Sequence, residues 1–312
     1  MYRQTIKFTI FFASILMLSG CIQQQKKVFS KKLFIKTSPA KNIEPLPTKN
    51  NPQDPITVTL WIHGTQLFPR SALRSIFAKP HGLIPANQFD KHYHLRMIAE
   101  TLAQTDPVNF PMEHIYLYGW SGALDFKERS RASHELYFGL QQLAKSYFQR
   151  FGQYPRFRLI THSHGGSVAL GLPRHQSKEN PIIIDELILL ACPVQSKTSH
   201  LIKDPMFKEK IALYSSLDLI QILDPQRLYE ECRGCGKIPF FSERKFPECE
   251  NLIQVKMKID GRALFHSDFM RLRFVAILPE ILEKLREWYK QTMIECLNHE
   301  QTCHILRVYT KK

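Results

Sequence analysis

Short apolar runs alternate along the chain with longer segments in which apolar residues recur every three or four positions. Six of these runs consist largely of β-branched and other large apolar residues and carry few charges, as strands buried within a sheet do. They span Ile56–Gly64, His114–Trp120, Arg156–His162, Asp185–Cys192, Lys210–Ser216 and Leu252–Ile259. The last of them alternates apolar with polar residues, which is typical of a strand nearer the edge of a sheet.

Three of the intervening segments predict helices, because their apolar side chains recur at helical spacing and would share one face. These residues are Leu136, Leu140, Leu143 and Tyr147; Leu95, Ile98 and Leu102; and, after Pro279, Ile281, Leu282, Leu285, Trp288 and Tyr289. Strands that alternate with helices favour a parallel sheet with helices on both faces. The pattern therefore predicts an α/β fold with a mostly parallel, doubly covered sheet.

Residues 1–20 have the pattern of a bacterial export signal. Arg3 and Lys7 precede an apolar stretch at residues 8–18. This stretch is too short to span a bilayer as a helix. The Leu-Ser-Gly-Cys sequence that ends at Cys21 resembles the lipobox of bacterial lipoproteins. The resemblance implies cleavage before Cys21, lipidation of its thiol and, because no Asp follows it, attachment to the outer membrane, and it leaves the membrane face open. An ordinary signal peptide with a chance cysteine is the alternative.

Residues 21–55 are predicted to form a flexible tether. They are rich in Pro, Lys, Gln and Asn and have few large apolar residues after Ile35, so they cannot bury enough surface to offset the entropy of ordering. Residues 56–312 then suit one large domain. Within it, residues 224–250 interrupt the alternation with three cysteines and several prolines. We expect an irregular insertion there, before the last strand. It could be cross-linked by disulfides, or it could form a lid over a site.

Six cysteines follow Cys21, and an oxidising periplasm would favour their pairing. They are Cys192, Cys232, Cys235, Cys249, Cys296 and Cys303. A disulfide between Cys296 and Cys303 is the first expectation. The three cysteines of the insertion form only part of a zinc pattern, since a fourth ligand is missing, so a disulfide there is favoured over a metal. Cys192 is expected to be buried.

The chain is basic, with 43 Lys and Arg against 28 Asp and Glu and a formal net charge of +15. The basic residues are scattered, and no nucleic-acid-binding motif accompanies them, so a nucleic-acid partner is not predicted. In a lipid-anchored protein, attraction to anionic headgroups accounts for such a charge.

The segment RLITHSHGGSVAL, Arg158–Leu170, places Ser163 between a predicted strand and a predicted helix. At such a junction the free N–H groups of the helix point toward whatever the hydroxyl would attack. Gly165 and Gly166 allow a tight turn and a close approach of the helix. The segment resembles the nucleophile elbow G-x-S-x-G of α/β-hydrolases, and it departs from that pattern at Thr161, where Gly is usual.

In α/β-hydrolases the catalytic acid follows the serine along the chain and the histidine comes last. Asp218 and His266 each follow a predicted strand in that order. The resemblance therefore implies an α/β-hydrolase fold with a triad of Ser163, Asp218 and His266, and Asp224 is the alternative acid. The histidines on either side of the serine are expected to point away from its hydroxyl.

His63-Gly64-Thr65, at the end of the first predicted strand, resembles the H-G-x turn of lipases and esterases. The resemblance implies that the backbone N–H groups of Thr65 and His164 form an oxyanion hole. The nearby Trp120-Ser121-Gly122 stretch is assigned to packing or to the wall of the site.

These features predict a serine hydrolase of carboxylesterase or lipase type that cleaves lipid or acyl esters through an acyl-enzyme, without a metal or organic cofactor. An acyltransferase or a thioesterase would use the same residues. A catalytically inactive hydrolase-fold lipoprotein that serves as a binding or scaffolding module of the envelope is the alternative from another class. Thr161 and the basic surface motivate that alternative.

Overall fold

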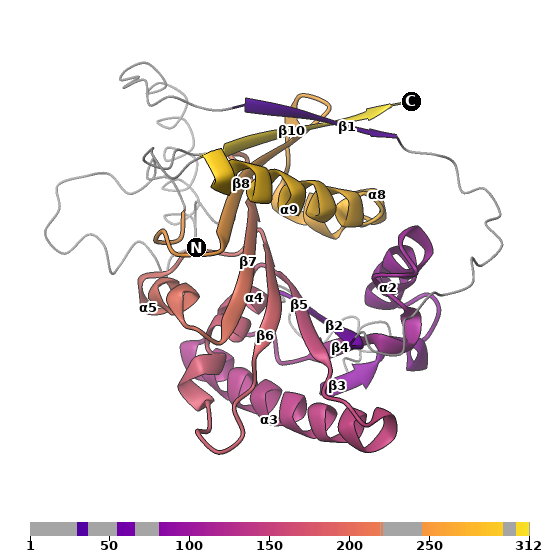
Figure 1. The fold of residues 1–312 in the computed structure, drawn as a ribbon, viewed down its shortest axis with the longest axis vertical. Helices are drawn as coiled ribbons and strands as arrows, with labels where there is room; N and C mark the ends of the chain where they lie inside the picture. The colour runs from indigo at the N-terminus through magenta and orange to yellow at the C-terminus, as the bar shows by residue number, and fades with distance from the viewer. Residues whose placement is uncertain are drawn as a thin grey trace, which may run out of the picture.

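The computed structural model describes residues 30–36, 55–65, 81–218, 220, 245–295 and 304–311. They form a ten-stranded sheet in the order β1-β10-β8-β7-β6-β5-β2-β4-β3, with β9 paired to β8 (Figure 1). The strands are β1 (Ser30–Lys36), β2 (Thr57–Ile62), β3 (Gly82–Pro85), β4 (Ile115–Gly119), β5 (Arg156–His162), β6 (Ile184–Leu190), β7 (Phe207–Tyr214), β8 (Leu252–Ile259), β9 (Arg262–Ala263) and β10 (His304–Lys311).

The centre of the sheet is parallel. Strand β2 pairs in parallel with β4 and β5, and the parallel ladder continues through β6, β7 and β8. Among the strands of the described residues, only the short β3 and β9 run antiparallel to their neighbours. The predicted α/β fold with a mostly parallel sheet is confirmed, and the predicted bounds of β5 and β8 agree with the structure residue for residue.

Helices cover both faces of the sheet, which lies between α3 and α9 in Figure 1. Side chains alternate along each strand, so Trp61 packs with α2 and α9 while its neighbour Leu60 packs with α3 and α4. The helices are α2 (His94–Thr105), α3 (Phe126–Phe151), α4 (His164–Leu170), α5 (Ser196–Ser199), α8 (Leu272–Val275) and α9 (Leu278–Glu295). Short 3-10 turns join them at η1 (Ala86–Gln88), η2 (Met112–His114), η3 (Leu172–His175), η4 (His200–Lys203) and η6 (His266–Met270).

The segment Ser30–Lys36 differs from the expected tether. It forms β1 and pairs in parallel with β10 over its whole length. The apolar residues Leu33, Phe34 and Ile35 have the high strand propensity that this pairing requires. The tether was predicted from the average composition of residues 21–55. The proline-rich residues that follow Lys36 dominate this average, so the short apolar run did not stand out.

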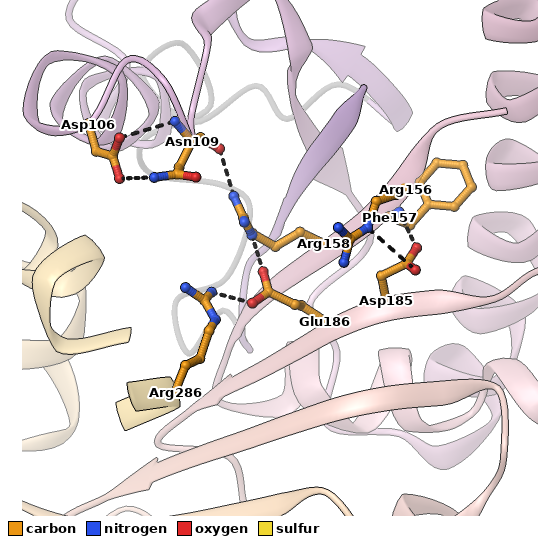
Figure 2. A network of polar contacts seen from close by, with 8 residues as sticks. All are labelled: Asp106, Asn109, Arg156, Phe157, Arg158, Asp185, Glu186 and Arg286. Atoms are coloured by element: carbon orange, nitrogen blue, oxygen red, sulfur yellow. Dashed lines mark hydrogen bonds and ion pairs between the residues drawn. The ribbon is translucent and has the colours of Figure 1, made fainter. Parts of the chain in front are cut away.

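A buried ion-pair network connects the sheet to α9 (Figure 2). Glu186 of β6 accepts hydrogen bonds from Arg158 of β5 and from Arg286 of α9, and Arg158 also donates to the Asn109 carbonyl at 2.7 Å. Burial alone would raise the pKa of Glu186, but the two guanidinium groups outweigh it, and the pKa lies below its ordinary value. The network links β5, β6 and α9. It lies at the N-terminal half of β5, away from Ser163 at the other end of the strand.

The predicted insertion at residues 224–250 is described only from residue 245 onward, so Asp224, Cys232 and Cys235 lie outside the described residues. Cys21, Cys296 and Cys303 lie outside them as well. Cys192 is buried, as expected, and both it and Cys249 are free thiols. Within the described ranges, no helix combines the length and apolarity needed to cross a bilayer.

Candidate active site

Three of the predicted site segments follow strands of the parallel ladder. His63–Thr65 follows β2, Ser163 follows β5, and Asp218 lies four residues beyond the end of β7. Parallel pairing runs from β2 through β5 and β6 to β7. Because the carboxyl ends of parallel strands meet at one edge of a sheet, these segments share that edge, where α/β proteins bind their ligands.

Ser163 has a strained backbone, with φ 54° and ψ −133°. Residues other than glycine rarely adopt this conformation, which costs about 1–3 kcal/mol and is found mostly at functional sites. The N–H of Ser163 donates to the Leu190 carbonyl of β6 at 2.9 Å, and the residue is 4% exposed. Its side chain makes no capping hydrogen bond to α4. The fold therefore places a hydroxyl at the start of a helix without using it as the cap.

Glycines let three backbone segments converge on Ser163. A Cβ atom at Gly165 would lie 2.6 Å from the carbonyl oxygen of His63, so α4 could not approach the end of β2 with a larger residue there. A Cβ atom at Gly64 would lie 2.6 Å from the Cβ of Ser163. The His63-Gly64-Thr65 turn and the serine turn are thus in direct contact.

The structure explains how threonine is accommodated at position 161. Thr161 is the penultimate residue of β5, is fully buried, and its hydroxyl donates to the Ile188 carbonyl at 3.2 Å. The positive φ of this turn falls on Ser163 rather than on Thr161. A β-branched residue at this position therefore does not have to adopt the strained conformation.

Asp218 and His266 form a hydrogen-bonded pair in which the carboxylate is buried and the imidazole is partly buried. The Nδ1 atom of His266 lies 2.9 Å from both carboxylate oxygens of Asp218, which is 1% exposed. Since a carboxylate only accepts, Nδ1 of His266 carries the proton and donates it, and in the neutral ring Nε2 is left as an acceptor. The pair joins residues 48 positions apart in the sequence.

His162, which sequence reasoning set aside, contacts the segment that carries His266. Its Nε2 atom donates to the His266 carbonyl at 3.0 Å, and the centroids of the two rings lie 4.7 Å apart. Burial, together with the charges that His266 and His63 can carry, lowers the pKa of His162 to about 3. His162 is therefore neutral at physiological pH and acts as a fixed hydrogen-bond donor.

Trp120 holds the turn after β2. Its indole Nε1 donates to the His63 carbonyl at 2.8 Å, and its backbone N–H donates to His63 Nε2 at 3.3 Å. The two rings stack with their centroids 5.7 Å apart. Nδ1 of His63 in turn donates to the Gly64 carbonyl at 2.6 Å, which fixes the tautomer of His63. Trp120 was assigned to packing or to the wall of the site, and these contacts show that it orients the turn.

Of the two residues predicted to supply oxyanion donors, His164 directly follows Ser163 in the chain, and Thr65 follows Gly64, where an added Cβ would meet Ser163. Thr65 is partly buried, and His164 is the buried first residue of α4. Across the described part of the chain, no group of three or more His, Cys, Asp or Glu side chains is arranged to hold a metal ion.

No protein-family model matches the sequence, and no curated protein matches it either. Among solved structures, the chain is similar to phospholipase PlaB from Legionella pneumophila, with 14% identity over 56% of this chain and 41% of that chain and a TM-score of 0.33. It is also similar to carboxyl esterase 2 from Tuber melanosporum (11% identity, 74% and 75% of the two chains, TM-score 0.39). An esterase from Pyrobaculum calidifontis gives 11% identity, 75% and 72% coverage and a TM-score of 0.36. The chain thus spans less than half of the Legionella phospholipase.

Proposed function

We propose that the protein is a serine hydrolase that cleaves carboxylic esters, with Ser163 as nucleophile, His266 as general base and Asp218 as the residue that orients the histidine. The observation that carries the proposal is the hydrogen-bonded Asp218–His266 pair; His162, the residue directly before Ser163, donates to the carbonyl of His266. The strained backbone of Ser163 supports it further, because such strain is kept mainly where function requires it.

In the proposed reaction, the Ser163 Oγ attacks the ester carbonyl while Nε2 of His266 takes the hydroxyl proton. The proton then passes from Nε2 to the leaving alcohol as the C–O bond breaks, and an acyl-enzyme remains. A water molecule attacks the acyl group with the same histidine as base, which releases the acid and restores the serine. Asp218 holds the Nδ1–H tautomer throughout and stabilises the imidazolium as it forms.

The backbone N–H groups of Thr65 and His164 are proposed to stabilise the tetrahedral oxyanion. Two observations support this proposal: a Cβ atom at Gly64 would lie 2.6 Å from the Cβ of Ser163, and the indole of Trp120 donates to the His63 carbonyl. Loss of one such donor in a hydrolase costs about 3 kcal/mol of transition-state stabilisation.

The substrate class we propose is a lipid or other acyl ester at a membrane. The support is the lipobox-like sequence at Cys21, from which we propose a lipid anchor in the outer membrane. In cell fractionation, the wild-type protein should be found with the membranes and Cys21→Ser should not; equal partitioning of the two would rule out the anchor.

Hydrolysis of p-nitrophenyl esters tests the proposed activity. The wild-type chain should release p-nitrophenol, Ser163→Ala should not, and Ser146→Ala, which removes an exposed hydroxyl from α3, should behave as wild type. A series of acyl chain lengths then distinguishes an esterase, which favours short chains, from a lipase. Absence of turnover in the wild type with every ester would favour a non-catalytic binding role.

A further inference from the structure

Strands β1, β10 and β8 form one end of the sheet, at the opposite end of the molecule from α3 (Figure 1). Three basic residues lie in β1, two in β10 and two in β8, and none of these strands contains an Asp or Glu. The nearest acidic residue along the chain after β8 is Asp260, in the turn that follows it. This end of the sheet therefore has a positive formal charge.

Strand register places most of these basic residues on one face of the sheet. Lys32 of β1 pairs with Arg307 of β10, and Arg307 pairs with Lys258 of β8. Residues paired across a ladder share a face, and so do alternate positions along one strand. Phe34 and Tyr309 pair with each other on the same face. We define the basic face by its six basic residues, which are Lys32, Lys36, Lys256, Lys258, Arg307 and Lys311.

The opposite face of β8 belongs to the hydrophobic core. Val255 and Met257 are buried in one cluster with apolar residues of α9. On the basic face, Lys256 and Lys258 are only partly buried. Among the described residues, the buried cluster on that side of the sheet includes Leu252 at the start of β8 and no later residue of the strand. The fold thus places core residues on one face and basic residues on the other.

The short chain before β1 favours a membrane as the partner of the basic face. Residues 22–29 separate Cys21 from Ser30, where β1 begins. A fully extended chain from Cys21 to Ser30 spans about 30 Å. A lipid anchor on Cys21 therefore keeps β1 near the bilayer, and this step rests on the proposed anchor. A Lys or Arg beside an anionic bilayer strengthens binding about fivefold.

We propose that the basic face binds the anionic lipid headgroups of the membrane that holds the anchor. The lipid chains attach the protein at one point, so they leave its orientation open. The basic face supplies a second contact and sets which side of the domain lies against the bilayer. Tyr309 fits this role, because tyrosine is enriched where proteins meet the headgroup region.

Vesicle flotation tests the basic face without the anchor. The full chain with Cys21→Ser is mixed with vesicles of phosphatidylcholine alone or of equal parts phosphatidylcholine and phosphatidylglycerol. It should bind the anionic vesicles more tightly, and salt should weaken this preference. Adding Lys256→Gln and Lys258→Gln should lower the partition coefficient on anionic vesicles about 30-fold. Residues 1–20 are present in every variant, so their contribution cancels in the comparison.

The matched control is Lys127→Gln with Lys145→Gln, which removes the same charge from exposed positions on α3 and should change binding little. Equal effects of the two double variants would show that net charge alone drives binding and would overturn the proposal. Equal binding to both kinds of vesicle would also overturn it. So would binding to a single-stranded oligonucleotide that depends on Lys256 and Lys258 without any preference for anionic vesicles.

The proposed anchor is tested separately by washing the membranes with high salt during cell fractionation. Salt releases proteins held by charge but not those held by lipid chains. Loss of the anchor in that experiment, with the vesicle preference intact, would refute the anchor and leave the basic face as a lipid-binding surface. An anchored protein without the vesicle preference would refute the basic face alone.

Discussion

Replacement of Asp218 by Asn probes the proposed catalytic mechanism most sharply. Both carboxylate oxygens of Asp218 lie 2.9 Å from Nδ1 of His266, and Asp218 is 1% exposed, so the carboxylate accepts the Nδ1 proton away from solvent. An asparagine can present its NH₂ group to Nδ1, and the imidazole then carries its proton on Nε2. That tautomer cannot accept the proton of Ser163.

The expected loss is large. In hydrolases with this arrangement the Asp-to-Asn change lowers kcat by about 10⁴-fold, which corresponds to about 5.5 kcal/mol of transition-state stabilisation. The assay is kcat/KM for a p-nitrophenyl ester, with circular dichroism to verify that Asp218→Asn is folded. Asp224→Asn is the control and should retain wild-type turnover. If Asp224→Asn is the inactive variant and Asp218→Asn is active, the assignment of the acid is wrong.

Three further predictions concern individual contacts. His162→Phe removes the donor to the His266 carbonyl and should lower kcat about tenfold, with partial recovery in His162→Gln; above about pH 5 the shape of the pH–rate profile should not change, because His162 is already neutral there. Glu186→Gln leaves Arg158 buried beside an uncharged group and should lower the free energy of unfolding by about 3–5 kcal/mol in urea titrations. Because the folded-state pKa of Glu186 lies below 4.5, this contribution is present above about pH 4.5 and is lost as the pH falls through the folded-state pKa, and a pH-independent difference between the two proteins would contradict it. Ser163→Gly relieves the backbone strain and should raise Tm by about 2–4 °C relative to Ser163→Ala, whereas equal Tm values would mean that the turn is not strained.

The sequence was sufficient for the central sheet because burial on both faces leaves a strong pattern. The apolar runs that became β2, β5 and β7 are recognisable without any knowledge of their partners. The sequence pattern of a strand does not show which distant strand it pairs with. The contact of β1 with β10 joins segments more than 250 residues apart, and nothing in Ser30–Lys36 alone specifies its partner.

The candidate site likewise has residues that the sequence pattern predicts and contacts that it does not predict. Ser163, Asp218 and His266 could be named because each follows a strand, and strand ends are readable from the pattern. The contact made by His162 could not be foreseen, because its partner is a backbone carbonyl 104 residues away in a turn whose path the sequence does not specify. The available signal was a histidine directly before Ser163, the proposed nucleophile. Trp120 was noticed, but its hydrogen bonds to His63 depend on the spacing of β2 and β4.

Covalent labelling with a fluorophosphonate, followed by peptide mass spectrometry, tests whether His266 activates the hydroxyl of Ser163. The probe reacts with a serine only when a base activates the hydroxyl. We expect one adduct, on the peptide that contains Ser163, and its loss in His266→Ala although the serine is still present. No adduct on Ser163, or equal labelling in His266→Ala, would contradict the claim that His266 activates Ser163.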